Sequence, residues 1–290
     1  MSAVLRHVVK YRPNWHIDFQ AELGRHCIGR GIVANTFEFG SPYPSQYYDA
    51  EVEILLFDTW YKWGDRPNTR VSSCLHERFG LEWVAECRLY QVHIREESKC
   101  AAQTILHPKS NIGVGRTSRR FVAIHYEGDS SQLKKNLSHR QIDEICTTIE
   151  DLDCVPVILD WRCRSPLSYR KLRSPGGWGG DAEMVCAVIS QCAAFVGIDS
   201  GPAKCASATD TQTLVVWTGH HPALFHDPAD NTTHLVPNGY HRLEPVCGNQ
   251  AVIEFFEKWY NIRMYEHDPI KEIKAWLEEV LKRGTNQYTT

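Results

Sequence analysis

A turn rich in small polar residues follows a short apolar run at residues 194–206, AFVGIDSGPAKCA. The run is too short for a core helix, so it predicts a buried strand that ends at Asp199. Ser200 suits the cap of a helix that follows at once, and Gly201 suits the tight turn into it. A helix N-terminus carries unpaired N–H groups and a partial positive charge, and Lys204 adds a cation. The segment therefore predicts a phosphate or diphosphate site, with a purely structural turn as the alternative.

A second polar segment, YEGDSSQLKK, follows the apolar run at residues 121–125. That run predicts a strand ending at His125. Small hydroxyl side chains and a lysine beside helix N-termini would neutralise the charge of a leaving diphosphate. The residues of this expected substrate-binding segment are Ser130, Ser131, Lys134 and Lys135, with His125 at the strand end. A solvated loop with a surface pair of lysines is the alternative.

Aromatic residues gather in the polar stretches before and after the apolar run at residues 52–57. Loops at the carboxyl ends of parallel strands are where open α/β sheets place ligands, and exposed aromatic faces suit sugar rings. The aromatic residues of these two loops are Tyr43, Tyr47, Tyr48, Trp60, Tyr61 and Trp63. We expect Trp60 and Trp63 to contact substrate. The alternative is that these rings fill a core beneath long loops.

Histidines follow the strand predicted at residues 213–218, in the segment WTGHHPALFHDP. Their imidazole faces suit a nucleotide base or ribose, and His220 is the candidate contact. A metal cluster of His220, His221 and His226 is disfavoured, because adjacent histidines project differently and no carboxylate-rich partner motif appears. Glu183, near the start of an earlier predicted helix, is a candidate ribose partner. An acid favoured there only by the helix dipole is the alternative.

The Asp-Ser-Gly motif at residues 199–201 resembles one in the C-terminal domain of the ADP-heptose:lipopolysaccharide heptosyltransferase-like family, a glycosyltransferase family 9-like group with the GT-B fold. In that family the motif grips the diphosphate of a sugar nucleotide and is followed by Pro or Leu, a small residue and His. Here Lys204 stands at the place of the histidine. The resemblance also implies that the segment holding Lys134 and Lys135 contacts the diphosphate, and that the segment around His220 lines the nucleotide.

Residues 3–19, AVLRHVVKYRPNWHIDF, resemble the first helix and second strand of the same family. The first strand and the Gly-Asp loop that precede this helix in the family have no counterpart here. In the family the Asp of that loop is the base of inverting transfer, a role in which a positioned group contributes about 10²–10⁴-fold. Either residues upstream of Met1 supply the base, or another acid has taken the role, and Asp58 and Asp65, which follow the apolar run at residues 52–57, are then the candidate catalytic bases. We expect slow transfer unless one of them serves.

Alternating strands and helices predict an α/β fold with parallel sheets. With the resemblance, they imply the GT-B architecture: two Rossmann-like domains, with C-terminal helices packing back across the domains. We expect an N-terminal acceptor-side domain at 1–108, a linker at 109–120, a C-terminal nucleotide-sugar-binding domain at 121–262, and a C-terminal helix and tail at 263–290.

Local patterns also predict individual elements. Ser138 and Gln141 have the spacing of a capping box, and Asp181 suits the start of another helix. The expected strands lie at 15–19, 31–39, 52–57, 89–94, 121–125, 155–159, 194–199 and 213–218, and further expected helices at 2–10, 22–31, 71–79, 250–261 and 268–284.

The composition is that of an ordinary globular protein, with 42% hydrophobic and 23% charged residues among 290. A formal net charge of −3 without a dominant basic stripe argues against a nucleic-acid partner. The 11 cysteines are scattered, which indicates neither a disulfide framework nor a zinc site and favours a cytoplasmic location. No apolar run reaches the ~18 residues of a membrane span, so contact with a membrane-bound acceptor would be peripheral.

These observations together predict a metal-independent, inverting glycosyltransferase that uses a nucleotide-diphosphate sugar and no cofactor. The acceptor, whether a sugar, a lipid-linked group or a protein, is not identified. Two alternatives share the fold, because function resides in the site and not in the architecture. They are a non-catalytic nucleotide-sugar-binding or scaffold protein, and a sugar-nucleotide epimerase.

Overall fold

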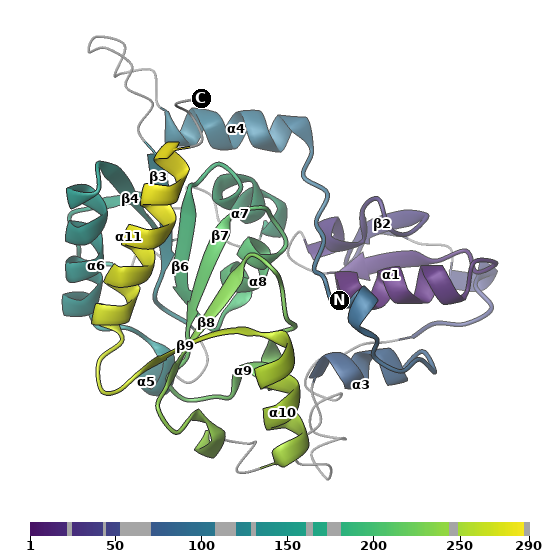
Figure 1. Cartoon of the computed structure of the whole chain (residues 1–290). Coiled ribbons are helices and arrows are strands. Elements are labelled where there is room, and N and C mark those ends of the chain that lie inside the picture. The colour runs from purple at the N-terminus through teal and green to yellow at the C-terminus, as the bar shows by residue number, and fades with distance from the viewer. Residues whose placement is uncertain are drawn as a thin grey trace.

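Two parallel sheets organise the chain, a large one of seven strands and a small one of two (Figure 1). The computed structural model describes residues 1–21, 25–42, 45–52, 71–107, 120–128, 132–160, 165–172, 181–243 and 249–286. A mixed α/β fold with parallel sheets is thereby confirmed.

The large sheet has the strand order β5-β4-β3-β6-β7-β8-β9. Its strands are β3 Arg120–His125, β4 Cys154–Leu159, β5 Arg170–Leu172, β6 Ala194–Ile198, β7 Gln212–Val216, β8 Thr232–Pro237 and β9 Asn261–Tyr265. The chain enters at β3, moves outward to β4 and β5, and then returns to the other side of β3 with β6. The strand order therefore reverses between β3 and β6. The crevice outside the carboxyl ends of two such strands is where open α/β sheets bind ligands.

Helices cover both faces of this sheet. One face packs against α6 His139–Asp151 and α11 Ile270–Asn286, and the other against α4 Glu96–Leu106, α7 Ala182–Ile189, α8 Gly201–Ser207 and α10 Gln250–Trp259. Alternate residues of β3 show the division, since Phe121 belongs to one buried cluster and Val122 to the other. Strands buried on both faces read as continuous apolar runs, and for this reason the sequence pattern locates β3, β4, β6 and β7. The short α5 Gln132–Lys135, α9 Pro222–Phe225 and the 3-10 turn η6 Tyr240–Arg242 complete this part.

The N-terminal part is smaller and less regular. It contains α1 Ser2–Tyr11, β1 Asp18–Ala21, η1 Arg25–Gly29, β2 Asn35–Glu38, η2 Ser45–Tyr47, α3 Val71–Glu77 and η3 Ala85–Cys87. Strands β1 and β2 pair in parallel. Its own small core joins α1 to the region of α3 through Val4, Val8, Leu75 and Leu81.

The two C-terminal helices have different neighbours. Helix α11 lies beside α6 on the large sheet, and Lys274 Nζ is 3.4 Å from Glu144 Oε2 across that contact (Figure 1). Helix α10 meets the N-terminal part, where the ring of Trp83 lies 4.9 Å from that of Phe255. Of the helices expected to pack back across the domains, α10 thus contacts the N-terminal part.

Several expected elements are confirmed with small shifts, and others were missed. The capping box of Ser138 and Gln141 and the cap of Asp181 are both present. Expected strands 15–19 and 31–39 are displaced or shortened to β1 and β2, because a turn after Arg12 and another after Gly29 hold the intervening backbone. Helices α4, α5 and α9 and strands β5, β8 and β9 were not expected. The strand at 52–57 and the linker at 109–120 fall almost entirely outside the described residues, and the domain boundaries stay predictions.

The strand expected at residues 89–94 is wrong. This stretch has no regular secondary structure, and its polar groups form hydrogen bonds with three residues that lie far from it in the sequence. Leu89 O accepts from Arg6 at 3.3 Å, and the Gln91 N–H donates to Ser2 Oγ at 2.9 Å. The hydroxyl of Tyr90 accepts from the N–H of Asp227 at 2.7 Å. Polar groups of this stretch therefore bond to α1 and to the segment after α9, and not to a neighbouring strand.

Candidate functional site

The candidate site lies where the carboxyl ends of β3, β6 and β7 meet. His125 ends β3, Asp199 and Ser200 follow β6, and Thr218 follows β7 by two residues. Because β3 and β6 border the reversal of strand order, this edge is the expected ligand position in an open parallel sheet. The structure thus brings together two segments that the sequence predicted as one diphosphate site.

Two lysines from different helices face the carboxylate of Asp199. Lys135 Nζ, at the end of α5, lies 3.6 Å from Asp199 Oδ2, and Lys204 Nζ, in α8, lies 4.0 Å from Oδ1. The carboxylate side chain is 10% exposed, whereas that of Lys204 is 40% exposed. Two ammonium groups thus face one carboxylate at the sheet edge. Asp199 therefore holds the two lysines close together, so a polyanion that binds here would meet two cations that are already in position.

Helix α5 is fixed to the loop after β7. The hydroxyl of Thr218 donates to the backbone carbonyl of Lys134. A Cβ atom on Gly219 would lie 3.0 Å from Lys134 Cβ and 3.1 Å from its carbonyl oxygen. Contacts this short mean that any larger residue at this position would push the two backbones apart by a few tenths of an ångström. The positions of Lys134 and Lys135 above the sheet thus depend on a residue 84 positions away, Thr218, and on the glycine beside it.

Ser200 occupies the N-cap position of α8, but its side chain does not cap the helix. Its Oγ lies 2.9 Å from His125 Nδ1 and donates to the carbonyl oxygen of Ile198 at 3.1 Å. His125 is 4% exposed, and burial lowers its pKa to about 3. The imidazole is therefore neutral at physiological pH. The cap expected from the sequence is right in position and wrong in its hydrogen bond.

Glu183 lies in the first turn of α7 and has partners of its own. Its carboxylate accepts from Arg30 Nη1 at 2.5 Å, from the backbone N–H of Arg95 at 2.9 Å and from Ser98 Oγ at 2.9 Å. Burial alone would raise the pKa of Glu183, but the hydrogen bonds from Arg95, Arg30 and Ser98 outweigh it and lower the pKa to about 2. Both oxygens thus accept from protein donors that tie α7 to earlier parts of the chain. Ribose binding by Glu183 stays a prediction.

Histidines after β7 occupy different environments. His220 is half-buried, and its ring lies 5.4 Å from that of Phe225. His221 and His226 are buried, and burial lowers the pKa of each to about 4. Within the described ranges, no three or more His, Cys, Asp or Glu side chains are grouped so as to hold a metal ion.

Six of the candidate residues lie outside the described residues. They are the catalytic candidates Asp58 and Asp65 and the substrate contacts Trp60, Trp63, Ser130 and Ser131. Their roles stay predictions, as do those of the described site residues. Sequence reasoning missed Thr218 and Gly219, whose only local signal is their place just after a predicted strand.

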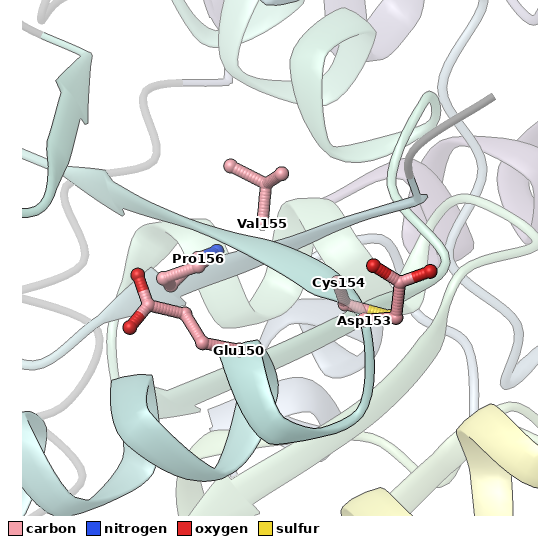
Figure 2. Close-up of a pocket in the computed structure, with 5 residues that line it drawn as sticks. All are labelled: Glu150, Asp153, Cys154, Val155 and Pro156. Atoms are coloured by element: carbon pink, nitrogen blue, oxygen red, sulfur yellow. The ribbon is translucent and has the colours of Figure 1, made fainter. Parts of the chain in front are cut away.

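A shallow hollow lies at the other end of β4, and its lining carries no cation. Figure 2 shows the residues around it: Glu150, Asp153, Cys154, Val155 and Pro156. Cys154 and Val155 begin β4, whereas the candidate site lies at the carboxyl ends of the strands. The two carboxylates would repel a diphosphate, so we assign no donor binding to this hollow.

Comparison with known proteins locates the fold among glycosyltransferases. No family model and no curated protein matches the sequence. The crystal structure of a glycosyl transferase family 9 protein from Veillonella parvula superposes with a TM-score of 0.65 at 10% identity, over 97% of this chain and 92% of that one. ADP-heptose lipopolysaccharide heptosyltransferase II of E. coli superposes with a TM-score of 0.54 at 11% identity, over 98% and 95%. The resemblance drawn from the motifs is therefore confirmed at the level of the fold. Every helix in the described ranges is too short or too polar to cross a membrane.

Proposed function

We propose that the protein is a glycosyltransferase that takes its sugar from a nucleotide-diphosphate donor. The observation that carries this is the convergence of Lys135 and Lys204, from two helices, on one carboxylate at the β3–β6 reversal. Support comes from the fold, which the chain shares over nearly its whole length with a family 9 glycosyltransferase and with an enzyme whose name states ADP-heptose as its donor.

The lysines supply what the departing group requires. When the bond between the anomeric carbon and the diphosphate oxygen breaks, negative charge grows on the diphosphate. Fixed cations and hydrogen-bond donors aimed at that charge lower the barrier. Lys135 and Lys204 would take the part that a divalent cation plays in metal-dependent transferases, so we propose transfer that needs no metal.

We further propose an inverting displacement, in which one base removes the acceptor proton as the acceptor oxygen attacks the anomeric carbon. Asp58 and Asp65 remain the proposed bases. The acceptor would bind on the N-terminal part, where Trp15, Phe39 and Tyr47 are exposed and offer flat apolar faces.

Calorimetric titration with ADP, GDP and UDP tests donor binding. Loss of a charge-assisted hydrogen bond typically costs about 1.5–3 kcal/mol, so Lys204→Ala and Lys135→Ala should each weaken the best of the three by roughly ten-fold or more. Lys99→Ala is the matched control, because Lys99 is 44% exposed and also faces a carboxylate, Glu96, but lies on α4. Wild-type protein that binds none of the three, or lysine variants that bind like Lys99→Ala, would contradict the proposal.

Release of nucleoside diphosphate from a panel of nucleotide sugars tests catalysis. Turnover should persist in a chelator and fall in Asp58→Asn or in Asp65→Asn. Turnover abolished by the chelator and restored by Mn²⁺ would contradict metal independence. Turnover that neither variant diminishes would remove both residues as bases.

A further inference from the structure

Ser200 stands at the start of a helix without capping it. Its backbone has the extended conformation of an N-cap residue, φ −161° and ψ 173°, and serine is among the residues preferred at that position. Its hydroxyl makes no bond to the N–H groups of α8, and instead lies 2.9 Å from His125 Nδ1 and 3.1 Å from the carbonyl oxygen of Ile198. Another interaction therefore draws the hydroxyl away from the helix.

The Ser200 hydroxyl could donate either to the carbonyl oxygen of Ile198 or to Nδ1 of His125, and only the first arrangement makes a hydrogen bond of both contacts. A serine hydroxyl has a single proton, and the carbonyl oxygen of Ile198 can only accept one. In that arrangement Ser200 Oγ donates to the carbonyl oxygen and accepts from the imidazole at Nδ1. Burial keeps His125 neutral, so only one of its ring nitrogens carries a proton. The structure thus assigns the Nδ1–H tautomer to His125.

The backbone holds the pair in register. His125 pairs with Gly197 across the β3–β6 ladder. A Cβ atom on Gly197 would lie 3.1 Å from the carbonyl oxygen of His125, so the two strands approach closely just where they end. The imidazole therefore ends one central strand, and the hydroxyl lies two residues beyond the end of the neighbouring strand.

We propose that His125 is a positioning residue that keeps the Ser200 hydroxyl a hydrogen-bond donor toward the diphosphate of the donor substrate. The inference rests on the proposed function. A phosphate oxygen accepts hydrogen bonds only, so the hydroxyl must turn its proton from Ile198 to the ligand. While the imidazole donates to Oγ, the hydroxyl cannot donate to His125. Rotation of the hydroxyl about its Cβ–Oγ bond therefore leaves its proton available to another acceptor.

A double-mutant cycle on the binding of ADP, GDP and UDP tests this coupling. We expect Ser200→Ala to weaken the best ligand by roughly ten-fold, as for the loss of a hydrogen bond to a charged group. His125→Leu should weaken it by a similar factor, and the double variant should bind no worse than Ser200→Ala, since residues acting through one contact are not additive. His125→Asn should bind within a few-fold of wild type, because its amide nitrogen takes the place of Nδ1.

The tautomer gives a second test that needs no substitution at His125. Long-range ¹H–¹⁵N correlation spectra of the wild-type protein, with the His125 signal assigned by its shift in Ser200→Ala, should show a protonated Nδ1 with and without nucleotide. A protonated Nε2 alone would overturn the inference even if both His125 variants failed to fold.

The outcomes separate the two proposals. If wild-type protein binds none of the three nucleotides, the proposed function and this inference both fall. If it binds, but Ser200→Ala has full affinity or His125→Leu costs the same factor with Ser200 present and absent, the inference falls and the lysine site stands. Unfolding midpoints of each variant show which affinity losses come from a damaged fold.

Discussion

The carboxylate of Glu183 lies 2.5 Å from the guanidinium of Arg30, a residue 153 positions earlier in the chain. Arg95 and Ser98 bond to the same carboxylate, which is 3% exposed. One acidic side chain thus joins three segments: the end of η1, the residue before α4 and α4 itself. Breaking this junction separates the N-terminal part from the large sheet at a buried point.

Glu183→Gln should lower the free energy of unfolding by about 3 kcal/mol, because it leaves two arginines without their counter-charge and removal of one partner of a buried pair costs about 3–5 kcal/mol. Urea unfolding measures the change. Glu96→Gln is the control, since Glu96 is 76% exposed and exposed pairs contribute about 0–1 kcal/mol. Equal effects of the two substitutions would show that the Glu183 junction contributes no more than a surface pair.

Stability should fall as the pH drops below about 6.5, because buried histidines resist protonation in the folded state. Burial lowers the pKa of His125 to about 3 and of His221 and His226 to about 4. In the unfolded chain histidine binds a proton near pH 6.5, so between pH 6.5 and about 4 the unfolded state holds more protons and is favoured as pH falls. Each such histidine should contribute a slope of roughly 1.4 kcal/mol per pH unit in that window.

His221→Asn tests this effect without removing a cap. His221 Nδ1 accepts from the N–H of Ala223 at the start of α9, and asparagine is a preferred residue at that position. Urea unfolding between about pH 7 and pH 5 should give a shallower pH dependence for the variant than for wild type, by about one proton. Parallel curves for the two proteins would mean that His221 titrates normally.

Gly219→Ala should weaken nucleotide binding by moving α5. The added methyl would lie 3.0 Å from Lys134 Cβ, so the helix carrying Lys134 and Lys135 must shift away from the sheet edge. We expect a loss of roughly 1–3 kcal/mol in stability, as for other overpacked sites, together with weaker binding of the nucleoside diphosphate. Calorimetry combined with thermal unfolding measures both. Thr218→Val is the companion variant, because it removes the hydroxyl that bonds to Lys134 while keeping the shape of the side chain.

Local patterns predicted the central strands and the site motif, and long-range contacts account for what they did not predict. Strands β3, β4, β6 and β7 are continuous apolar runs, and the small and polar residues of the segment 199–204 predict a turn by themselves. Apolar and polar residues alternate only weakly in the edge strand β9, NIRMY. The sequence therefore does not separate this strand from the helix that precedes it. Helix α4 carried a usable signal, with Glu96 and Glu97 in its first turn and Ala102 and Leu106 buried four residues apart.

The arrangement of the site could not be derived from spacing. The hydrogen bond from Thr218 to Lys134 joins residues 84 positions apart. The Ser200 hydroxyl contacts His125, 75 positions away, and not the N–H groups of its own helix. Glu183 illustrates the limit most directly. Its sequence context favours an acid in the first turn of a helix, but its partners come from segments that no local pattern places nearby.

Gly201→Ala separates a requirement of the ligand from a requirement of the fold. Apart from its chain neighbours and the backbone of its own helix, no described atom lies within 4 Å of where a Cβ atom on Gly201 would be, and its backbone is not in the left-handed region. Alanine is also a better helix former than glycine, so the free energy of unfolding should change by no more than about 0.5 kcal/mol.

If a diphosphate binds beside Ser200 and Lys204, the methyl group that Gly201→Ala adds should prevent its close approach to the backbone. Affinity for the nucleoside diphosphate should then fall by roughly ten-fold, the effect of losing one charge-assisted contact. Gly197→Ala is a control with the opposite expected effect on stability. Its methyl group would lie 2.5 Å from Phe195 Cζ and should lower the free energy of unfolding. A Gly201→Ala protein that is as stable as wild type and binds every nucleoside diphosphate equally well would place the ligand away from this turn.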